Sequence, residues 1–303
     1  MSTESTTFVR SREWLPQGGA DAMGQAPVTI IEPTKGPLAL DWGELWRYRD
    51  LLYFLILRDL KVRYKQTLLG VGWAVLVPLT QMAILGVIFG KVARLPSDGL
   101  NPFLFYLAGL VPWQYFANAL STSSTSLVTY SQLLTRIYFP RLSIPIAICI
   151  ANLVDFAIAF AMLLLVMLGM GILPASTIVF VPLVMGVAFV TTLGTGLLLS
   201  AMNVKYRDVK FVVPFLIQIW MYVSVVLPFS QIPENWGAWR YLYGLNPMVG
   251  VIECFRWSLL HPEMSQVDPP WLLFMMGLPV TFFLLFFGLH YFRRTERVFA
   301  DVV

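Results

Sequence analysis

The chain has 303 residues, of which 57% are hydrophobic and 13% are charged, and its mean hydropathy is +0.70. Ordinary soluble domains carry roughly 25% charged residues, so the composition excludes a soluble enzyme and indicates an integral membrane protein. The net charge of +4 depends on where the cations lie along a membrane chain, and it does not predict a nucleic-acid partner.

Residues 1–40 are rich in Ser, Thr, Gly and Pro and contain no apolar run. A cleaved signal peptide needs such a run. The segment is therefore expected to form a flexible cytoplasmic extension.

Residues 41–66 combine charged and apolar side chains. Asp41 and Glu44 suit the start of a helix, because an acceptor caps the free N–H groups and an acid complements the helix dipole. The pattern that follows predicts an amphipathic helix lying along the cytoplasmic membrane surface.

A basic cluster ends this segment and consists of Arg58, Lys61, Arg63 and Lys65. Each cation near an anionic leaflet gains about 1 kcal/mol of lipid attraction, so the cluster suits orientation and anchoring. It also suits a second role, the guidance of a lipid diphosphate at a cytoplasmic entrance. Both interpretations stay open.

Six stretches with at most one charge are long enough to cross a bilayer as helices, which takes ~20 residues. A charge at the centre of such a helix costs about 2.5–3.5 kcal/mol, so charges mark the limits of the spans. The expected spans are residues 68–90, 102–129, 143–168, 175–202, 211–229 and 270–292. They define a transmembrane domain over residues 67–294, and residues 295–303 form a cytoplasmic tail.

The cations assign a side to each loop. When the loops alternate, all but four of the 21 Lys and Arg residues fall on the side that holds both termini. Because cytoplasmic loops carry the excess of Lys and Arg, both termini are expected in the cytoplasm.

The segment 230–261 is too polar to span and is expected on the external side as a pair of short re-entrant helices. Its aromatic side chains suit either stacking on sugar rings or the interfacial belt of Trp and Tyr. The candidate external gate consists of Trp236, Trp239, Tyr241, Tyr243, Asn246 and Pro247.

Asp155 is the one acidic residue inside an expected span. An intramembrane carboxylate is by default a functional candidate, here for contact with a proton or a substrate. The alternative is a hydrogen-bonded contact between helices, with Asn152 one turn earlier or with a neighbour's Ser or Thr.

The sequence offers no catalytic centre. It contains no GxxxxGK[ST] motif, so no phosphate-binding loop of that kind is expected, and ATP-driven work would need a second polypeptide. The cytoplasmic acids after Asp59 form no close pair, and His261 and His290 stand apart, so neither a metal site nor a catalytic residue is expected.

Two short cytoplasmic loops mix cations with aromatic side chains. Topology explains the cations, whereas the aromatics suit either a partner protein's groove or the membrane interface. The loop residues are Arg136, Tyr138, Phe139, Pro140, Arg141, Tyr206, Arg207 and Asp208.

From residue 41 to the C-terminus, a series of short motifs resembles the membrane subunits of bacterial polysaccharide ABC exporters. These are the ABC-2 type permeases that serve O-antigen, capsule and teichoic acid export. The matching residues are Arg58, Tyr64, Lys65, Leu69, Gly70, Trp73, Pro78, Gly109, Pro112, Trp113, Phe139, Pro140, Arg141, Asn203, Tyr206, Arg207, Asp208, Asn246, Pro247, Glu296, Phe299, Ala300 and Asp301. Each motif is short, and it is their order against the six spans that is specific.

The resemblance implies the ABC-2 type (type V) exporter fold, which is all-α with six transmembrane helices, an N-terminal interface helix and external re-entrant helices. It implies a homodimer with two copies of a separate ATPase subunit, which would bind ATP and Mg²⁺, while this chain binds no cofactor. The two cytoplasmic loops would face that ATPase. The first and fifth spans would line a glycan channel, with Trp73, Trp220 and Tyr222 as candidate lining residues.

Together these observations predict a permease of the bacterial inner membrane that exports an undecaprenyl-diphosphate-linked polysaccharide, first of all O-antigen. Export of capsular polysaccharide or teichoic acid is the nearest alternative. An ABC-2 exporter of drugs or small lipids shares the expected fold. A membrane-embedded enzyme that modifies glycolipids is a further alternative, disfavoured by the missing carboxylate pair.

Overall fold

The structure is a computed structural model that describes residues 42–65, 70–136, 139–232, 242–262 and 269–296. These residues belong to one compact unit, residues 37–303. All regular elements within the described ranges are helical, which confirms the all-α prediction. The extension 1–40, the tail from residue 297 onward, and Tyr138, Trp236, Trp239 and Tyr241 lie outside the described residues.

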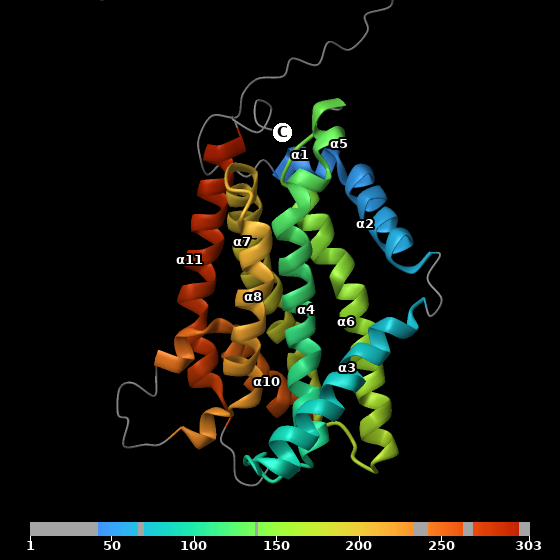
Figure 1. Cartoon of the computed structure of the whole chain (residues 1–303), viewed down its shortest axis with the longest axis vertical. Coiled ribbons are helices and arrows are strands. Elements are labelled where there is room, and N and C mark those ends of the chain that lie inside the picture. Colours follow the sequence, from blue (N-terminus) through green and yellow to red (C-terminus); the bar gives the residue numbers. More distant parts are fainter. Residues whose placement is uncertain (1–41, 66–69, 137–138, 233–241, 263–268, 297–303) are drawn as a thin grey trace, which may run out of the picture. The chain divides into compact units, whose positions relative to one another are not determined.

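Two helices precede the first expected span, α1 (Trp42–Arg47) and α2 (Arg49–Tyr64). The helices that follow are α3 (Gly72–Leu85), α4 (Pro102–Thr129), α5 (Ser131–Arg136), α6 (Ser143–Gly169), α7 (Val181–Lys205), α8 (Val209–Met221), α10 (Pro247–Leu260) and α11 (Trp271–Glu296) (Figure 1). Two π-helical turns, η1 (Gly86–Val92) and η3 (Tyr222–Val226), extend α3 and α8. The 3₁₀ turns are η2 (Ser176–Phe180), η4 (Phe229–Gln231) and η6 (Tyr243–Leu245).

Within the described ranges, five helical stretches are long and apolar enough to cross a membrane. They are Gly72–Val92, Ser143–Gly169, Ser176–Lys205, Val209–Val226 and Trp271–Glu296. Each overlaps one expected span. The other expected span, 102–129, is the 28-residue α4, which is uncharged but carries several amide and hydroxyl side chains. A sixth span therefore stays a prediction.

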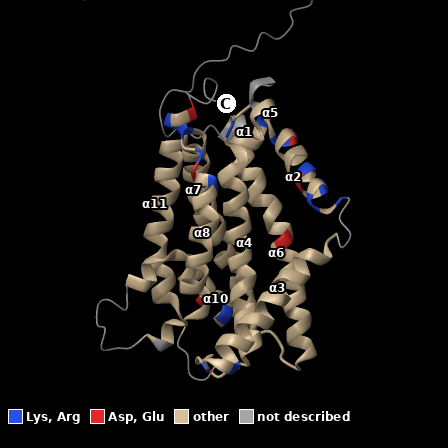
Figure 2. Cartoon of the chain, in the orientation of Figure 1, with Lys and Arg blue, Asp and Glu red and all other residues tan. Residues whose placement is uncertain are grey.

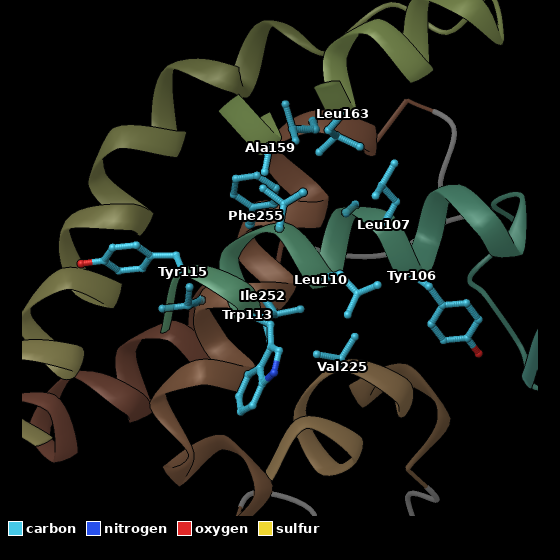
Figure 3. Packing of buried hydrophobic residues seen from close by; sticks show 14 of the residues in the cluster. Tyr106, Leu107, Leu110, Trp113, Tyr115, Ala159, Leu163, Val225, Ile252 and Phe255 are labelled. Atoms are coloured by element: carbon cyan, nitrogen blue, oxygen red, sulfur yellow. The ribbon is translucent and has the colours of Figure 1, made fainter. Parts of the chain in front are cut away.

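Helix α4 is central to the unit and packs against α3, α6, α7, α8 and α10. Figure 3 shows Leu110 and Trp113 of this helix close to Val225 of η3 and Ile252 of α10. These side chains belong to the main buried cluster. A helix that is covered by protein on most sides tolerates polar groups better than one covered by lipid, which accounts for the buried Ser123, Ser124 and Ser126 of α4.

Helices α4 and α10 begin in the same way. The side-chain oxygens of Asn101 and Asn246 accept hydrogen bonds from the backbone N–H groups of Phe103 at 3.0 Å and Met248 at 3.1 Å. A proline follows each Asn at the first helical position, where its missing N–H costs nothing. Asn246 and Pro247, which the sequence placed in an external gate, therefore start α10.

Helices α7 and α11 approach closely at two glycines. A Cβ atom at Gly288 would overlap the carbonyl oxygen of Gly194 and lie 3.0 Å from its carbonyl carbon. Along the same contact, the Thr191 and Thr281 hydroxyl oxygens lie 2.9 Å apart. Small residues let membrane helices pack backbone against backbone, so these positions fix the distance between the two helices.

Charged side chains gather at one end of the unit, where α5 and the end of α11 lie (Figure 2). We call it the charged end and define it by Arg141, Lys205, Arg207, Arg293 and Arg294, which lie at or beside helix ends. The turns η1 and η3 lie at the opposite end of α3 and α8.

Candidate functional site

The structure divides the basic cluster on α2 into two pairs. The side chains of Arg58 and Arg63 are only 31% and 30% exposed, and both contact acids. Lys61 and Lys65 are exposed and have no acidic partner within the described ranges. The lysines, rather than the arginines, therefore carry the positive charge that a ligand can reach.

Arg63 pairs with Asp155 of α6. Its Nη1 forms an ion pair with Asp155 Oδ2 and donates to Asn152 Oδ1 at 3.2 Å, and the Tyr64 hydroxyl donates to Asp155 Oδ1. Burial raises the pKa of Tyr64, against the opposing effect of Arg63, so this hydroxyl is protonated and can donate at neutral pH. These contacts place Asp155 between helices, where it ties the end of α2 to α6. Arg63 and Tyr64 are its partners instead of the neighbouring Ser or Thr that the sequence suggested.

A second polar contact ties α2 to the end of α4. Arg58 Nη2 lies 3.2 Å from Asp59 Oδ1, and the Tyr130 hydroxyl donates to the same carboxylate oxygen. The Arg58 guanidinium also lies over the Tyr130 ring, with Cζ 4.1 Å from the ring centroid. Such a cation–π contact adds to the attachment.

Two cavities lie beside α2 and share Arg63 as a lining residue. The smaller, of about 230 Å³, lies among α2, α3, α4 and α6 and is also lined by Trp73, Asn118 and Asp155. The larger, of about 540 Å³, lies among α2, α4 and α6 and is also lined by Thr125. The walls of both cavities are mostly apolar, and Arg63, Asn118, Asp155 and Thr125 are among the polar side chains set into them. Polar side chains within an expected span are candidates for function.

The three residues predicted to line a channel lie in different surroundings. Trp73, near the start of α3, is 53% exposed and lines the smaller cavity. Tyr222 is 44% exposed, and its ring centroid lies 6.4 Å from that of Phe89 in η1. Trp220 packs against α4, 5.1 Å from Phe116 between ring centroids. Trp73 and Tyr222 therefore keep accessible ring surface, whereas Trp220 contributes to the aromatic packing around α4.

The π-helical turns at the ends of α3 and α8 leave backbone carbonyls outside the regular pattern, and such turns are frequent at functional sites. Side chains that follow in the sequence form hydrogen bonds with η3 and with Leu227 directly after it. The single hydrogen of the Tyr243 hydroxyl is within hydrogen-bond reach of two carbonyl oxygens, Leu227 O at 2.7 Å and Val223 O. Asn246 Nδ2 donates to Ser224 Oγ at 2.9 Å. Two of the predicted gate residues thus hold the end of the fifth expected span.

Arg256 is the largest fully buried side chain among the described residues, although its position in the segment 230–261 makes it one of the four cations expected on the external side. Its Nε donates to Phe105 O at 3.2 Å and its Nη2 to Val225 O at 2.6 Å, while its Nη1 lies 3.4 Å from Glu253 Oε1. A side chain at Gly109 would overlap the guanidinium. Arg256 therefore joins α10 to α4 and η3. The sequence signal for this contact is Gly109, one of the residues that match the family motifs, because a larger side chain there would overlap the guanidinium.

The described residues of the first cytoplasmic loop, Phe139, Pro140 and Arg141, pack against the rest of the chain. Phe139 is 4% exposed and packs in the second buried cluster with Leu55 and Phe292. Arg141 donates to the backbone oxygen of Glu296. The predicted surface aromatic of this loop is therefore covered by the chain itself. Pro140 is half-buried, and Arg136 ends α5.

The second loop is accessible. Tyr206 is 51% exposed, and Arg207 and Asp208 are exposed beside it. All three lie between the end of α7 and the start of α8, at the charged end. Among the described residues of the two loops, those of the second loop are the more exposed and therefore the more accessible to a partner.

The five long apolar helices and the charged end together define a multi-pass helical membrane protein. Residues 50–260 match the family described as ABC-2 type transporter. The chain therefore belongs to the ABC-2 type transporter family, which confirms the resemblance carried by its motifs.

Individual relatives match over most of their length. The chain is 28% identical over 262 residues to the O-antigen export system permease protein RfbA of Myxococcus xanthus, covering 86% of this chain and 98% of that protein. It is 28% identical over 256 residues to the RfbA protein of Klebsiella pneumoniae, covering 84% and 95%. It is also 27% identical over 247 residues to the polysialic acid transport protein KpsM of Escherichia coli, covering 80% and 92%.

Proposed function

We propose that this chain is the membrane-spanning permease subunit of an ABC transporter that exports a lipid-linked polysaccharide, most specifically O-antigen, across the bacterial inner membrane. The observation that carries the proposal is the nearly full-length similarity to O-antigen export permeases, within a chain that belongs to the ABC-2 type family. The amide and hydroxyl side chains that line the two cavities beside α2 are consistent with a hydroxyl-rich substrate.

The transporter would contain two copies of this chain and two copies of a separate ATPase subunit, which binds ATP and Mg²⁺. Tyr206, Arg207 and Asp208 are the best placed of the predicted coupling residues, because they are exposed at the charged end. The charged end would face the cytoplasm, because cytoplasmic loops carry the excess of Lys and Arg. Both termini would then be cytoplasmic.

The undecaprenyl diphosphate group would first meet Lys61 and Lys65, since Arg58 and Arg63 already pair with acids. Among the four residues of the basic cluster, substitution of the lysines should therefore weaken recognition of the diphosphate most directly. Substitution of the arginines should instead loosen α2.

The function is tested with the chain and its ATPase partner reconstituted together in proteoliposomes. Undecaprenyl-diphosphate-linked O-polysaccharide should stimulate ATP hydrolysis and appear on the far side of the membrane. Stimulation by the capsular polysaccharide alone would favour the alternative supported by the similarity to KpsM. Stimulation only by hydrophobic drugs, or transferase activity of the isolated chain, would contradict the proposal.

Helix α4 would be the sixth span, because its 28 residues are uncharged and long enough to cross the bilayer. Single cysteines at Ser97 and Ser131, which flank α4, test this assignment. An impermeant thiol reagent should label them from opposite sides of the membrane, and labelling from one side would refute it.

A further inference from the structure

A row of polar side chains follows one face of α4. Gln114, Asn118, Thr122, Thr125 and Thr129 recur at spacings of three or four residues, so they share that face. Asn118, Thr122 and Thr129 are exposed, and Gln114 and Thr125 are half-buried. We call these five residues the polar stripe. Apolar packing within the unit does not cover it.

The polar stripe forms a wall of both cavities beside α2. Gln114 and Asn118 line the cavity of about 230 Å³, and the three threonines line the cavity of about 540 Å³. Arg63 lines both cavities, so they adjoin at this residue. The stripe thus leads from the charged end of α4 to the middle of the helix.

The hydroxyl groups of the polar stripe are oriented as acceptors. Thr122 donates to Asn118 O at 2.7 Å, Thr125 to Thr122 O at 3.3 Å and Thr129 to Thr125 O at 3.0 Å. Because each hydrogen points to the helix backbone, the oxygen lone pairs remain for another donor. The Asn118 side chain adds an amide with no hydrogen-bond partner within the described ranges.

The electrostatics of the cavities favour a neutral ligand. Both cationic side chains that line them are already paired, Arg58 with Asp59 and Arg63 with Asp155. An anionic ligand would have to displace a carboxylate from its partner, whereas a ligand rich in hydroxyl groups needs only donors and acceptors. Trp73 adds an exposed ring at the wall of the smaller cavity.

We propose that the polar stripe binds the hydroxyl groups of a polysaccharide chain and guides it along α4 within the membrane. The proposal rests on the proposed export function and adds a location and a ligand chemistry to it. Neutral sugar units fit the combination of acceptor oxygens on the polar stripe, apolar wall, paired charges and the exposed Trp73 ring. The diphosphate of the carrier lipid fits the exposed lysines outside the cavities better.

The first test removes the three hydroxyl groups with the triple variant Thr122→Val, Thr125→Val and Thr129→Val. Valine keeps the size and β-branching of threonine but cannot accept a hydrogen bond. The matched control is Thr80→Val on α3, because Thr80 is exposed, donates to Leu76 O at 2.8 Å and lines neither cavity.

The measurement is substrate-stimulated ATPase activity of the reconstituted complex with two probes, undecaprenyl diphosphate carrying an extended polysaccharide and the same lipid carrying one sugar. The half-saturating concentration of the extended probe should rise about tenfold in the triple variant, as expected for the loss of a few hydrogen bonds. The half-saturating concentration of the single-sugar probe should be the same for the triple variant and the wild type. For the Thr80→Val variant, the half-saturating concentrations of both probes should equal those of the wild type. An equal rise for both probes, or no rise, overturns the polar stripe as a sugar-binding surface.

A second measurement does not depend on the stability of the triple variant. A single Thr125→Cys substitution is labelled with a thiol reagent, and the native Cys149 and Cys254 are buried and free, so they give little background. The extended polysaccharide probe should slow labelling, and the single-sugar probe should not. Disulfide formation between two copies at residue 125 in the resting complex would show that a second copy covers the stripe, and it would overturn the proposal.

The two proposals fail in different ways. A wild-type complex that the extended probe does not stimulate would contradict the export function. A wild type that is stimulated, beside a triple variant with unchanged half-saturation and an unprotected residue 125, would contradict only the polar stripe.

Discussion

Replacing Gly109 with alanine should destabilise the protein, because the added Cβ would enter the space of the Arg256 guanidinium. It would overlap Nη2 and lie 3.0 Å from Cζ and 3.2 Å from Nε. A flexible surface arginine would swing away at little cost. Arg256 cannot, since it is fully buried, packs 3.7 Å from the Phe105 ring centroid and donates to Val225 O at 2.6 Å.

The magnitude follows from these contacts. Overpacking a buried site costs about 1–3 kcal/mol, and leaving the Val225 carbonyl without its donor costs about 1–3 kcal/mol more. Because the guanidinium adjusts partly, we expect a loss of about 2–4 kcal/mol in total. For a chain of this size, that loss corresponds to a fall in Tm of about 3–6 °C.

Thermal melting of the purified protein in detergent measures this loss, and Gly186→Ala is the matched control. Gly186 also lies in a long helix, but nothing lies within 4 Å of a Cβ placed there. The Gly109→Ala substitution is then repeated in an Arg256→Ala background, where the overlap no longer exists. Equal melting temperatures for the two glycine variants, or an undiminished cost in the Arg256→Ala background, would refute the reasoning.

Three further predictions concern the helix contacts and the charged end. Gly288→Ala should cost more stability than Gly109→Ala, because the new Cβ meets the backbone of α7, which cannot rotate away; thermal melting compares them. Arg63→Ala or Asp155→Ala should each cost about 1–2 kcal/mol, since each leaves a partly buried charge unpaired, and the double variant should cost less than the sum. Tyr206→Ala should lower coupled ATPase activity at unchanged Tm, whereas Phe139→Ala should lower Tm by removing a buried ring.

The control for the Arg63 variant is an exposed position on the same helix. Lys61→Ala on α2 should leave Tm unchanged, since the side chain is exposed and carries no acidic partner in the described part of the chain. Additive losses in the double variant of Arg63 and Asp155 would show that the two residues act separately. A Tyr206→Ala variant with normal coupling would remove that residue from the partner surface.

Much of the fold was predictable because the signals are local. A charge is costly in lipid wherever it occurs, so the gaps between charges locate the apolar helices without knowledge of their neighbours. The predicted span 143–168, for example, corresponds to α6, Ser143–Gly169. Helix α4 was less clear by composition, because it carries hydroxyl groups that neighbouring helices bury, such as Ser123 and Ser126, and amide and hydroxyl groups that face the cavities, such as Asn118.

The contacts of the candidate site could not be predicted in the same way. Asp155 was identified as exceptional from its position in an apolar span, but its partners Arg63 and Tyr64 lie on α2, far away in the sequence. Phe139 was expected at the surface from its polar surroundings, and packing against Leu55 and Phe292 buries it.

By itself, the sequence determined the membrane class, five of the helical spans and the family motifs, because transfer free energies and short-range patterns depend on each segment alone. Only the tertiary structure decided which cations are paired, which aromatics are covered and where polar side chains of α4 meet a cavity. These properties depend on the approach of segments that are distant in the chain. The side chain of Arg256 shows the difference, since the same residue is a loop cation in the sequence and a buried anchor between helices in the fold.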